Sequence, residues 1–247
     1  MKINKTLPQH FYNTIVDINT RKITDEYTYR VTEILNPTKI ILLTRRHYEN
    51  IEIDDIDLVW SMFGTAVHNL IEQRGADTTT ILEERLKKRF GKYWITGQFD
   101  CYTQHNKELR DIKVTTSYVV MYNTRQFEWT MQQNIYRLLL QDASYKVDKI
   151  YIDAIVKDYN KNKSKQIPNY PQTIVTSIPI EILPEQEVIN FINTKFSEIE
   201  HYNNVCDNDL PICDETDRWV NDIRCKEYCN CNVFCNYYQN NYGDSNE

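Results

Sequence analysis

Hydrophobic and polar residues alternate most clearly along two neighbouring segments near the middle of the chain. Tyr93–Thr103 and Leu109–Thr116 are rich in aromatic and β-branched residues, and the polar residues between them are typical of a turn. This pattern predicts a β-hairpin.

The predicted hairpin carries a group of charged residues that could share one site. Side chains alternate across a strand, so Asp111 and Lys113 are expected on one face while Ile112 points to the other. Asp100 comes from the facing strand. Two carboxylates and an ammonium group suit a divalent cation and a hydrolytic water. On these residues alone, an exposed hairpin that contains one salt bridge is the better interpretation.

Val59–Arg74 has apolar residues at intervals of three and four, which predicts an amphipathic helix. Glycine inside a helix costs about 1 kcal/mol relative to alanine, so Gly64 is expected to permit a close approach by another group. His68 and Glu72 lie one turn apart, and His68 could either ligate a metal or form a hydrogen bond at the edge of the core. The expected core face consists of Phe63, Ala66, Val67, Leu70 and Ile71.

Two more helices are predicted on either side of the hairpin. Thr78–Gly91 ends at a glycine and contains the densest group of basic side chains, which fit a solvated face or contact with a DNA backbone. Asn123–Asp142 is expected to be a long helix with Gln132 and Tyr136 on a stripe beside its buried face. The basic group comprises Arg85, Lys87, Lys88, Arg89 and Lys92, and the buried face comprises Phe127, Met131, Ile135, Leu138 and Leu139.

The remaining elements complete a mixed architecture. Val147–Val156 and Thr173–Leu183 are predicted strands with a polar loop between them, and Pro184–Tyr202 is a predicted helix opened by proline. Helices, hairpin, helix, two strands and a helix in this order predict a mixed central β-sheet flanked by helices, an α/β or α+β fold.

The segment before the first long helix has weaker signals. Tyr27–Pro37 predicts a short strand or turn that leads into a helix, with Thr32 as its N-cap. Thr38–Asn50 mixes apolar residues with cations, which fit a solvated helix face or a phosphate backbone. These cations are Lys39, Arg45, Arg46 and His47.

Length, composition and charge limit the class of protein. The chain has 247 residues, 41% of them hydrophobic and 26% charged, which is enough for one domain of ordinary size with its own core. No run of about 18 apolar residues is present, and the first residues do not form an apolar signal segment, so we expect a cytoplasmic protein and no membrane span. The net charge of −6 does not itself indicate nucleic-acid binding.

Cysteine is concentrated near the end of the chain. Six of the seven cysteines lie between Cys206 and Cys235. Without a signal segment, a metal or cluster site is a better interpretation than disulfides. The chain is therefore divided into an N-terminal arm (1–26), a main domain (27–202) and a cysteine-rich segment (203–247).

Four short motifs occur in a fixed order on these elements. They are Gly64-x-x-x-His68, Gly97-x-x-Asp100, Asp111-Ile112-Lys113 and Gln132-x-x-x-Tyr136. Together they resemble the motifs of the RecB-like branch of the PD-(D/E)XK nucleases, including phage exonucleases with a C-terminal cysteine cluster. The resemblance implies a core like that of restriction endonucleases.

The resemblance also implies a role for each matched residue. His68, Asp100, Asp111 and the Ile112 carbonyl would bind Mg²⁺ or Mn²⁺. Lys113 would position or help deprotonate the attacking water, or stabilise the developing charge. Gln132 and Tyr136 would hold the scissile strand or brace Lys113.

The cysteine tail is similar to that of iron–sulfur members of the same branch. On this resemblance Cys213, Cys225, Cys229 and Cys235 would bind a [4Fe–4S] cluster, and Cys206 and Cys231 would be spare. The spacing of the thiolates suits Zn²⁺ equally well, and unligated cysteines are a third reading. The sequence departs from the iron–sulfur relatives because no cysteine precedes Gly64.

These observations lead to one expected function and two alternatives. We expect a metal-dependent DNA exonuclease acting on single strands or ends in recombination, repair or phage DNA metabolism, with a helicase or recombination protein as a candidate partner. If phage-encoded, it would work in the bacterial host cytoplasm. The alternatives are a structure-specific or restriction-type endonuclease and a non-catalytic cysteine-cluster module that binds DNA or a partner.

Overall fold

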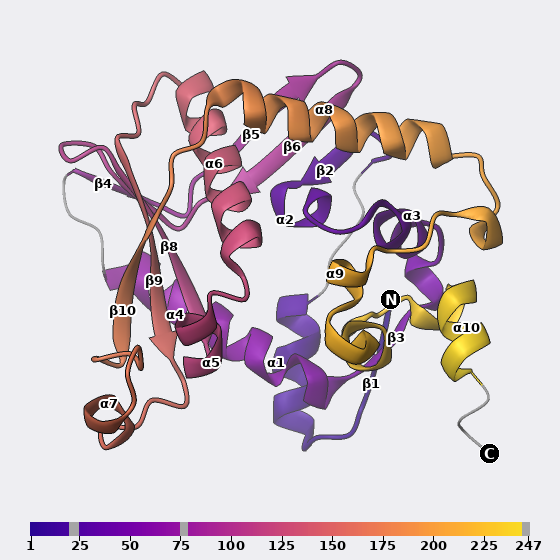
Figure 1. Ribbon diagram of the computed structural model, residues 1–247, viewed down its shortest axis with the longest axis horizontal. Coiled ribbons are helices and arrows are strands. Elements are labelled where there is room, and N and C mark those ends of the chain that lie inside the picture. Colours follow the sequence, from indigo (N-terminus) through magenta and orange to yellow (C-terminus); the bar gives the residue numbers. More distant parts are fainter. Residues whose placement is uncertain (20–24, 75–78, 244–247) are drawn as a thin grey trace. The chain divides into compact units, whose positions relative to one another are not determined.

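The computed structural model describes residues 1–19, 25–74 and 79–243, which form two compact units. The terminal unit combines Met1–Glu26, Glu33–Val59 and Asn190–Glu247, and the central unit combines Tyr27–Thr32 with Trp60–Ile189. The colours of Figure 1 show that each unit is assembled from separate stretches of sequence. These units are interleaved along the chain, whereas the sequence-based division used consecutive segments; that division into domains stays a prediction.

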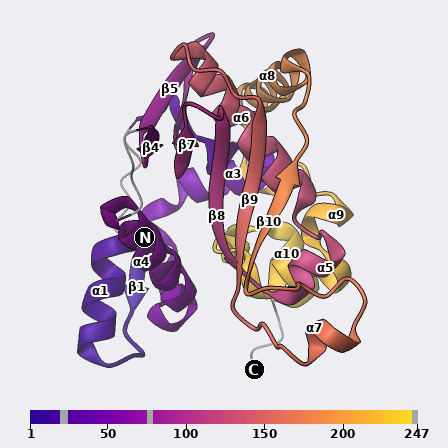
Figure 2. The same ribbon diagram turned by 90° about the vertical axis from the view of Figure 1, so that its left-hand side faces the viewer.

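A five-stranded mixed sheet forms the main layer of the central unit. Its order is β10-β9-β8-β7-β4, with β8 and β9 parallel and the other pairs antiparallel (Figure 2). The α/β class with a mixed sheet flanked by helices is confirmed. Strand β9 shows why the alternation of apolar and polar residues predicted a strand: every second residue from Ile150 to Val156 is buried. The strands are β4 (Thr80–Leu82), β7 (Cys101–Thr103), β8 (Glu108–Thr115), β9 (Lys149–Val156) and β10 (Val175–Ile180).

A second sheet of three strands, in the order β2-β6-β5, corrects the helix predicted for Thr78–Gly91. Thr78 lies outside the described residues, and the rest of this segment contains β4 and β5. In β5, Leu86 and Phe90 alternate with exposed basic residues, so this strand has a period of two residues and pairs along its whole length with β6. The strands are β2 (Thr28–Arg30), β5 (Arg85–Phe90) and β6 (Tyr93–Gln98).

The predicted hairpin is present, but its first strand is broken. The prediction of one strand over Tyr93–Thr103 is wrong, because β6 belongs to the three-stranded sheet and β7 to the five-stranded sheet. Of β6 and β7, it is β7 that pairs with β8, with Cys101 opposite Arg110 and Thr103 opposite Glu108. Asp100 lies in the break between the two strands, immediately before β7.

Helix α4 (Val59–Arg74) has the predicted bounds but not the predicted core face. Phe63, Ala66 and Leu70 are exposed, Leu70 to 63%, among the described residues. A Cβ built on Gly64 meets no described atom within 4 Å, so the expected close approach to this glycine does not come from the described chain.

The helix predicted over Asn123–Asp142 is divided. Asn123, with φ of 53°, terminates α5 (Ser117–Tyr122), and α6 (Gln126–Asp142) follows. Phe127 is exposed, contrary to prediction, while the other four expected core residues of this helix are buried. A short helix, α7 (Lys163–Gln166), interrupts the polar loop between β9 and β10.

The terminal unit contains a parallel strand pair and most of the short helices. Lys2–Asn4 (β1) pairs with Glu52–Asp54 (β3), so part of the predicted arm is regular structure. Its α-helices include α1 (Gln9–Asn19), α3 (Thr38–Arg46), α9 (Glu215–Arg218) and α10 (Asn236–Tyr242). Helix α2 (Val31–Ile34) and helix α8 (Glu185–Tyr202) belong partly to each unit. Because α2 begins at Val31, Thr32 is not its N-cap.

The cations of the segment after α2 are not the solvated or phosphate-facing group that was expected. Lys39 is only 2% exposed, and its Nζ donates to the Leu210 carbonyl over 3.2 Å. Arg46 and His47 both pair with the Asp207 carboxylate at 2.6 Å. These side chains therefore hold the terminal unit together. No helix of the described chain combines the length and the apolar character needed to cross a membrane.

Candidate functional site

Strand β8 presents Asp111 and Lys113 together, as the alternation of side chains predicts. The Lys113 Nζ lies 2.7 Å from Asp111 Oδ2, and Asp111 is 2% exposed. Burial alone would lower the pKa of Lys113, but the carboxylates of Asp111 and Asp100 outweigh it and raise the pKa above its usual value. Lys113 is therefore protonated, and its ammonium group is fixed against the Asp111 carboxylate.

The break before β7 brings the buried carboxylate of Asp100 beside β8. Its Oδ2 accepts a hydrogen bond of 2.6 Å from the backbone N–H of Ile112. Burial, and then the charge of Asp111, raise the pKa of Asp100 to about 7. Two carboxylates close together in a buried place repel each other when both are charged, and a cation relieves that repulsion.

Helix α4 contributes His68, which faces the carboxylates of Asp100 and Glu83. The His68 Nδ1 lies 3.0 Å from Glu83 Oε1 and 3.4 Å from Asp100 Oδ1. The hydrogen bond to Glu83 is the largest cause of a raised pKa for His68. One ligand atom from each of these three residues lies within 4.8 Å of the other two.

Glu83 is the site residue that the sequence analysis missed. It lies between β4 and β5, where a helix was predicted, and its backbone N–H donates to the Asp100 carbonyl over 3.0 Å. Gln98 Nε2 donates to the second Glu83 oxygen over 2.9 Å. The sequence did contain one signal, since two acidic residues, Glu83 and Glu84, directly precede the basic segment that forms β5. Glu72, by contrast, is exposed.

Helix α6 supplies Gln132 and Tyr136 on one buried stripe. The Gln132 Nε2 lies 3.3 Å from Asp111 Oδ1 and 3.4 Å from the Tyr136 hydroxyl. Burial and the charge of Asp111 raise the pKa of Tyr136 to about 12. A Cβ on Gly97 would come within 2.4 Å of the Tyr136 ring, so glycine allows the ring to lie against β6.

The central unit thus brings together the chemically active side chains of the four motifs, which are His68, Asp100, Asp111, Lys113, Gln132 and Tyr136. Oxygen donors from Asp100, Asp111 and Glu83 with the imidazole of His68 match the ligands that Mg²⁺ and Mn²⁺ accept. The raised pKa of Asp100 is the observation that favours a cation here, because the positive charges of His68 and Lys113 do not offset burial and the repulsion from Asp111. Asp100, Asp111, Glu83 and His68 are called the acidic site below.

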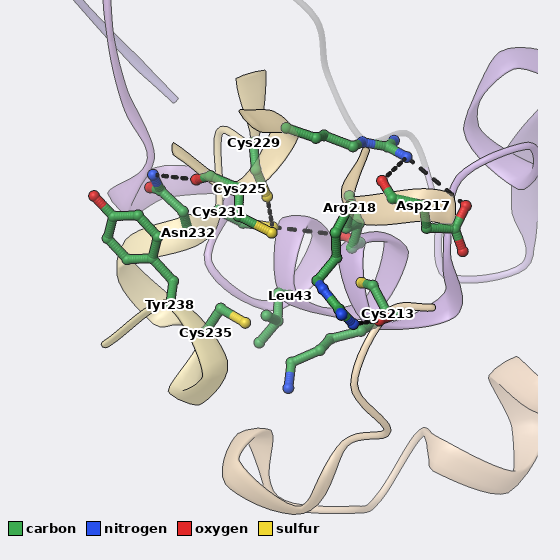
Figure 3. A pocket seen from close by; sticks show the side chains of 13 residues that line it. Leu43, Cys213, Asp217, Arg218, Cys225, Cys229, Cys231, Asn232, Cys235 and Tyr238 are labelled. Carbon is green, nitrogen blue, oxygen red and sulfur yellow. Dashed lines mark hydrogen bonds and ion pairs between the residues drawn. The ribbon is translucent and has the colours of Figure 1, made fainter. Parts of the chain in front are cut away.

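The terminal unit contains a separate pocket lined by cysteines (Figure 3). The thiols that line it are Cys213, Cys225, Cys229, Cys231 and Cys235, so the pocket has five thiols rather than the four that were assigned to a cofactor. Cys206 is exposed and does not line it. The Sγ atoms of Cys229 and Cys231 lie 3.6 Å apart, and this contact is the main cause of the lowered pKa of Cys229, about 7.

Cationic side chains also line the cysteine pocket. Lys39, Arg218 and Arg224 all contribute to its wall. Arg218 donates to the Cys213 carbonyl, and the Arg224 Nη2 donates to Asn36 Oδ1 over 2.7 Å. Burial raises the pKa of Cys213 to about 12 and also raises the pKa of Cys225, so these thiols would lose their protons only on binding a metal, which takes thiolates as ligands. The pocket therefore fits a thiolate-ligated metal or cluster without selecting between iron and zinc.

Comparisons with known proteins give a fold but not a family. No protein-family model matches the sequence, and no curated protein resembles it significantly. The crystal structure of SSO0001 is similar with a TM-score of 0.60 and 16% sequence identity, over 92% of this chain and 94% of that chain. A phage-related exonuclease from Haemophilus somnus 129PT has a TM-score of 0.35 and 16% identity, over 77% of each chain.

Proposed function

We propose that the protein is a metal-dependent DNA nuclease, acting as an exonuclease on single strands or ends. The observation that carries this proposal is the acidic site, where buried carboxylates and an imidazole lie beside the Lys113 ammonium group. Hydrolysis of a phosphodiester requires positive charge near the phosphate and a positioned water. The acidic site with Lys113 offers side chains for both requirements.

His68, Asp100 and Asp111 would hold Mg²⁺ or Mn²⁺, with the Ile112 carbonyl as a further ligand and Glu83 as an additional carboxylate from the structure. A bound divalent cation would supply charge neutralisation at the phosphate and would acidify a water. Lys113 would orient that water or stabilise charge on a phosphate oxygen.

Gln132 and Tyr136 would keep the charged groups of the site in position. The Gln132 amide donates to Asp111, which fixes the carboxylate that also pairs with Lys113. Both side chains are buried on a long helix, and such support restricts the rotamers of a reactive group.

The cysteine pocket would hold a cofactor with a structural role. We assign Cys213, Cys225, Cys229 and Cys235 as ligands of a [4Fe–4S] cluster, with Zn²⁺ as the alternative. The segment 203–247 is rich in polar residues, and thiolate ligation would supply stability that its small apolar content does not.

End-labelled and circular DNA, each single- and double-stranded, would test the activity with Mg²⁺, Mn²⁺ or EDTA. An exonuclease shortens labelled linear strands and leaves circles intact, whereas an endonuclease opens circles. Asp111→Ala, which removes a carboxylate that serves the cation, is expected to abolish cleavage without unfolding the protein. Binding without cleavage by the wild type in either metal would instead indicate a non-catalytic DNA-binding module, and cleavage by Asp111→Ala would reject the acidic site.

A further inference from the structure

Exposed aromatic side chains gather where β8 and β9 end in the central unit. Trp60 is 54% exposed, Tyr118 60% and Tyr122 62%. The Lys157 Nζ lies 3.5 Å from the centre of the Trp60 ring, and the rings of Tyr118 and Tyr122 lie 4.8 Å apart. Neighbouring large rings with this exposure are uncommon on a protein surface without a binding function.

The backbone fixes these rings close to one another and to the acidic site. Strands β8 and β9 are parallel, and the N–H of Lys157 donates to the Thr115 carbonyl over 2.9 Å. The N–H of Ser117 donates to Asp158 over 2.6 Å, so α5 begins beside the end of β9. Tyr118 therefore follows closely on the β8 segment that carries Lys113.

Helix α4 gives a second connection to the acidic site. Trp60 and His68 lie on this helix eight residues apart, about 12 Å along its axis. The aromatic surface and the acidic site are thus joined by regular structure, within reach of one short stretch of nucleic acid.

Positive charge accompanies the rings. Lys157, Lys161, Lys163 and Lys165 follow β9, and all four are exposed. Rings that stack on bases, next to ammonium groups that meet phosphates, are the combination that binds unpaired nucleotides. The bases of a duplex are stacked on one another, so its phosphates could contact the lysines but its bases could not stack on the aromatic rings.

We propose that Trp60, Tyr118 and Tyr122 form a stacking surface for the bases of single-stranded nucleic acid, whose phosphates contact the four lysines. Its role as part of a substrate path rests on the proposed nuclease function, since the strand bound there would continue to the acidic site. The occupant is a single strand because only unpaired bases offer their faces to the rings.

Binding of fluorescent oligothymidylate, measured by anisotropy in Ca²⁺ at fixed salt, tests the proposal. Trp60→Ala is expected to weaken binding about tenfold, as is the Tyr118→Ala/Tyr122→Ala double variant, because stacking on each ring is lost. Trp60→Phe should retain most of the affinity. An abasic oligonucleotide of the same length should bind wild type weakly and bind Trp60→Ala equally weakly.

Phe11→Ala is the matched control, because Phe11 is an exposed ring of the terminal unit. Equal oligothymidylate affinity for wild type and Trp60→Ala would overturn the proposal. The proposal would also fail if Trp60→Ala lost as much affinity for the abasic strand as for oligothymidylate. If wild type cleaves duplex DNA but does not bind oligothymidylate, the stacking surface is wrong and the proposed function stands. If it binds oligothymidylate through the rings but cleaves no nucleic acid, the proposed function fails and the surface stands.

Discussion

Asp100 is placed where its own negative charge is disfavoured. Its folded pKa of about 7 exceeds the ordinary unfolded value of about 4, so the folded protein retains a proton that the unfolded chain has released between these pH values. The associated stability is full below about pH 4 and declines as the pH rises through about 7. A functional carboxylate here is held at the expense of stability.

Asp100→Asn is therefore expected to stabilise the metal-free protein at pH 8 while removing activity. The amide carries no charge and can still accept from the Ile112 N–H, so the free energy of unfolding should increase by about 2 kcal/mol at pH 8 and change little at pH 4. Urea unfolding in EDTA at both pH values measures this. Parallel stability profiles for wild type and variant would show that Asp100 titrates normally.

Lys113→Ala is expected to slow single-turnover cleavage by about two to four orders of magnitude, because a positioned charge or proton-transfer group is lost. DNA affinity in Ca²⁺ should change little, since one charge is a small part of the contact with phosphates. Lys149→Ala is the control, as Lys149 lies on the neighbouring strand and pairs with Glu108 instead. Weak binding with an unchanged single-turnover rate would make Lys113 a docking residue only.

At the scale of elements, the sequence predicted a helix or strand correctly where the spacing of apolar residues fitted one period only. Strand β8 was predicted within one residue at each end and α4 at both ends, because alternation and helical period are local properties. Leu86 and Phe90 also alternate, but good helix formers around them obscured this strand, and pairing with β6 decided the outcome. Glu83 was missed for the same reason.

The exposed face of α4 could not be foreseen from its sequence. An apolar stripe predicts that a helix buries something, but it does not identify the partner or place it within the chain. The acidic site was easier to predict, since Asp111 and Lys113 share a strand face by geometry alone. The cysteine pocket was predictable only in part. The spacing of the cysteines indicated a shared site, but it did not indicate that Cys231 also lines the pocket.

Two glycines offer a paired test of the elements around the acidic site. Gly97→Ala should destabilise the protein by about 1–3 kcal/mol, because the new Cβ would overlap the Tyr136 ring and the Val31 side chain. It should also reduce cleavage by displacing Tyr136 and Gln132. Gly64→Ala meets no described atom and should stabilise helix α4 by about 0.5–1 kcal/mol. Thermal or urea unfolding with cleavage assays measures both, and a destabilised Gly64→Ala would reveal a neighbour of that glycine.

At the scale of the whole molecule, the cysteine pocket should decide the stability of the terminal unit. Protein purified without oxygen is expected to be brown and to contain iron, and serine at Cys213, Cys225, Cys229 or Cys235 should remove the colour and lower the unfolding temperature. Visible absorption and metal analysis by mass spectrometry measure this. Acidic-site chemistry should be affected less.

Two other cysteines serve as controls for this prediction. Cys206→Ser should change nothing, because Cys206 lies outside the pocket. Cys231→Ser should retain iron if the other four thiols suffice, and loss of iron would make Cys231 a ligand. Colourless protein with stoichiometric zinc would change the metal but keep the ligands, and a stable, active, metal-free protein would remove the cofactor.

The interleaved units have a consequence for synthesis on the ribosome. Residues 60–189 complete the central unit while the last segment of the terminal unit, from Asn190 onward, is still to be made. At about 5–20 residues per second that segment requires roughly 3–12 seconds. When this interval begins, Lys39 has been made but its acceptors Leu210 and Asn236 have not. The nascent chain therefore carries a finished acidic site before the cysteine pocket exists, and all four ligands proposed for the cofactor of that pocket are present only after translation reaches Cys235.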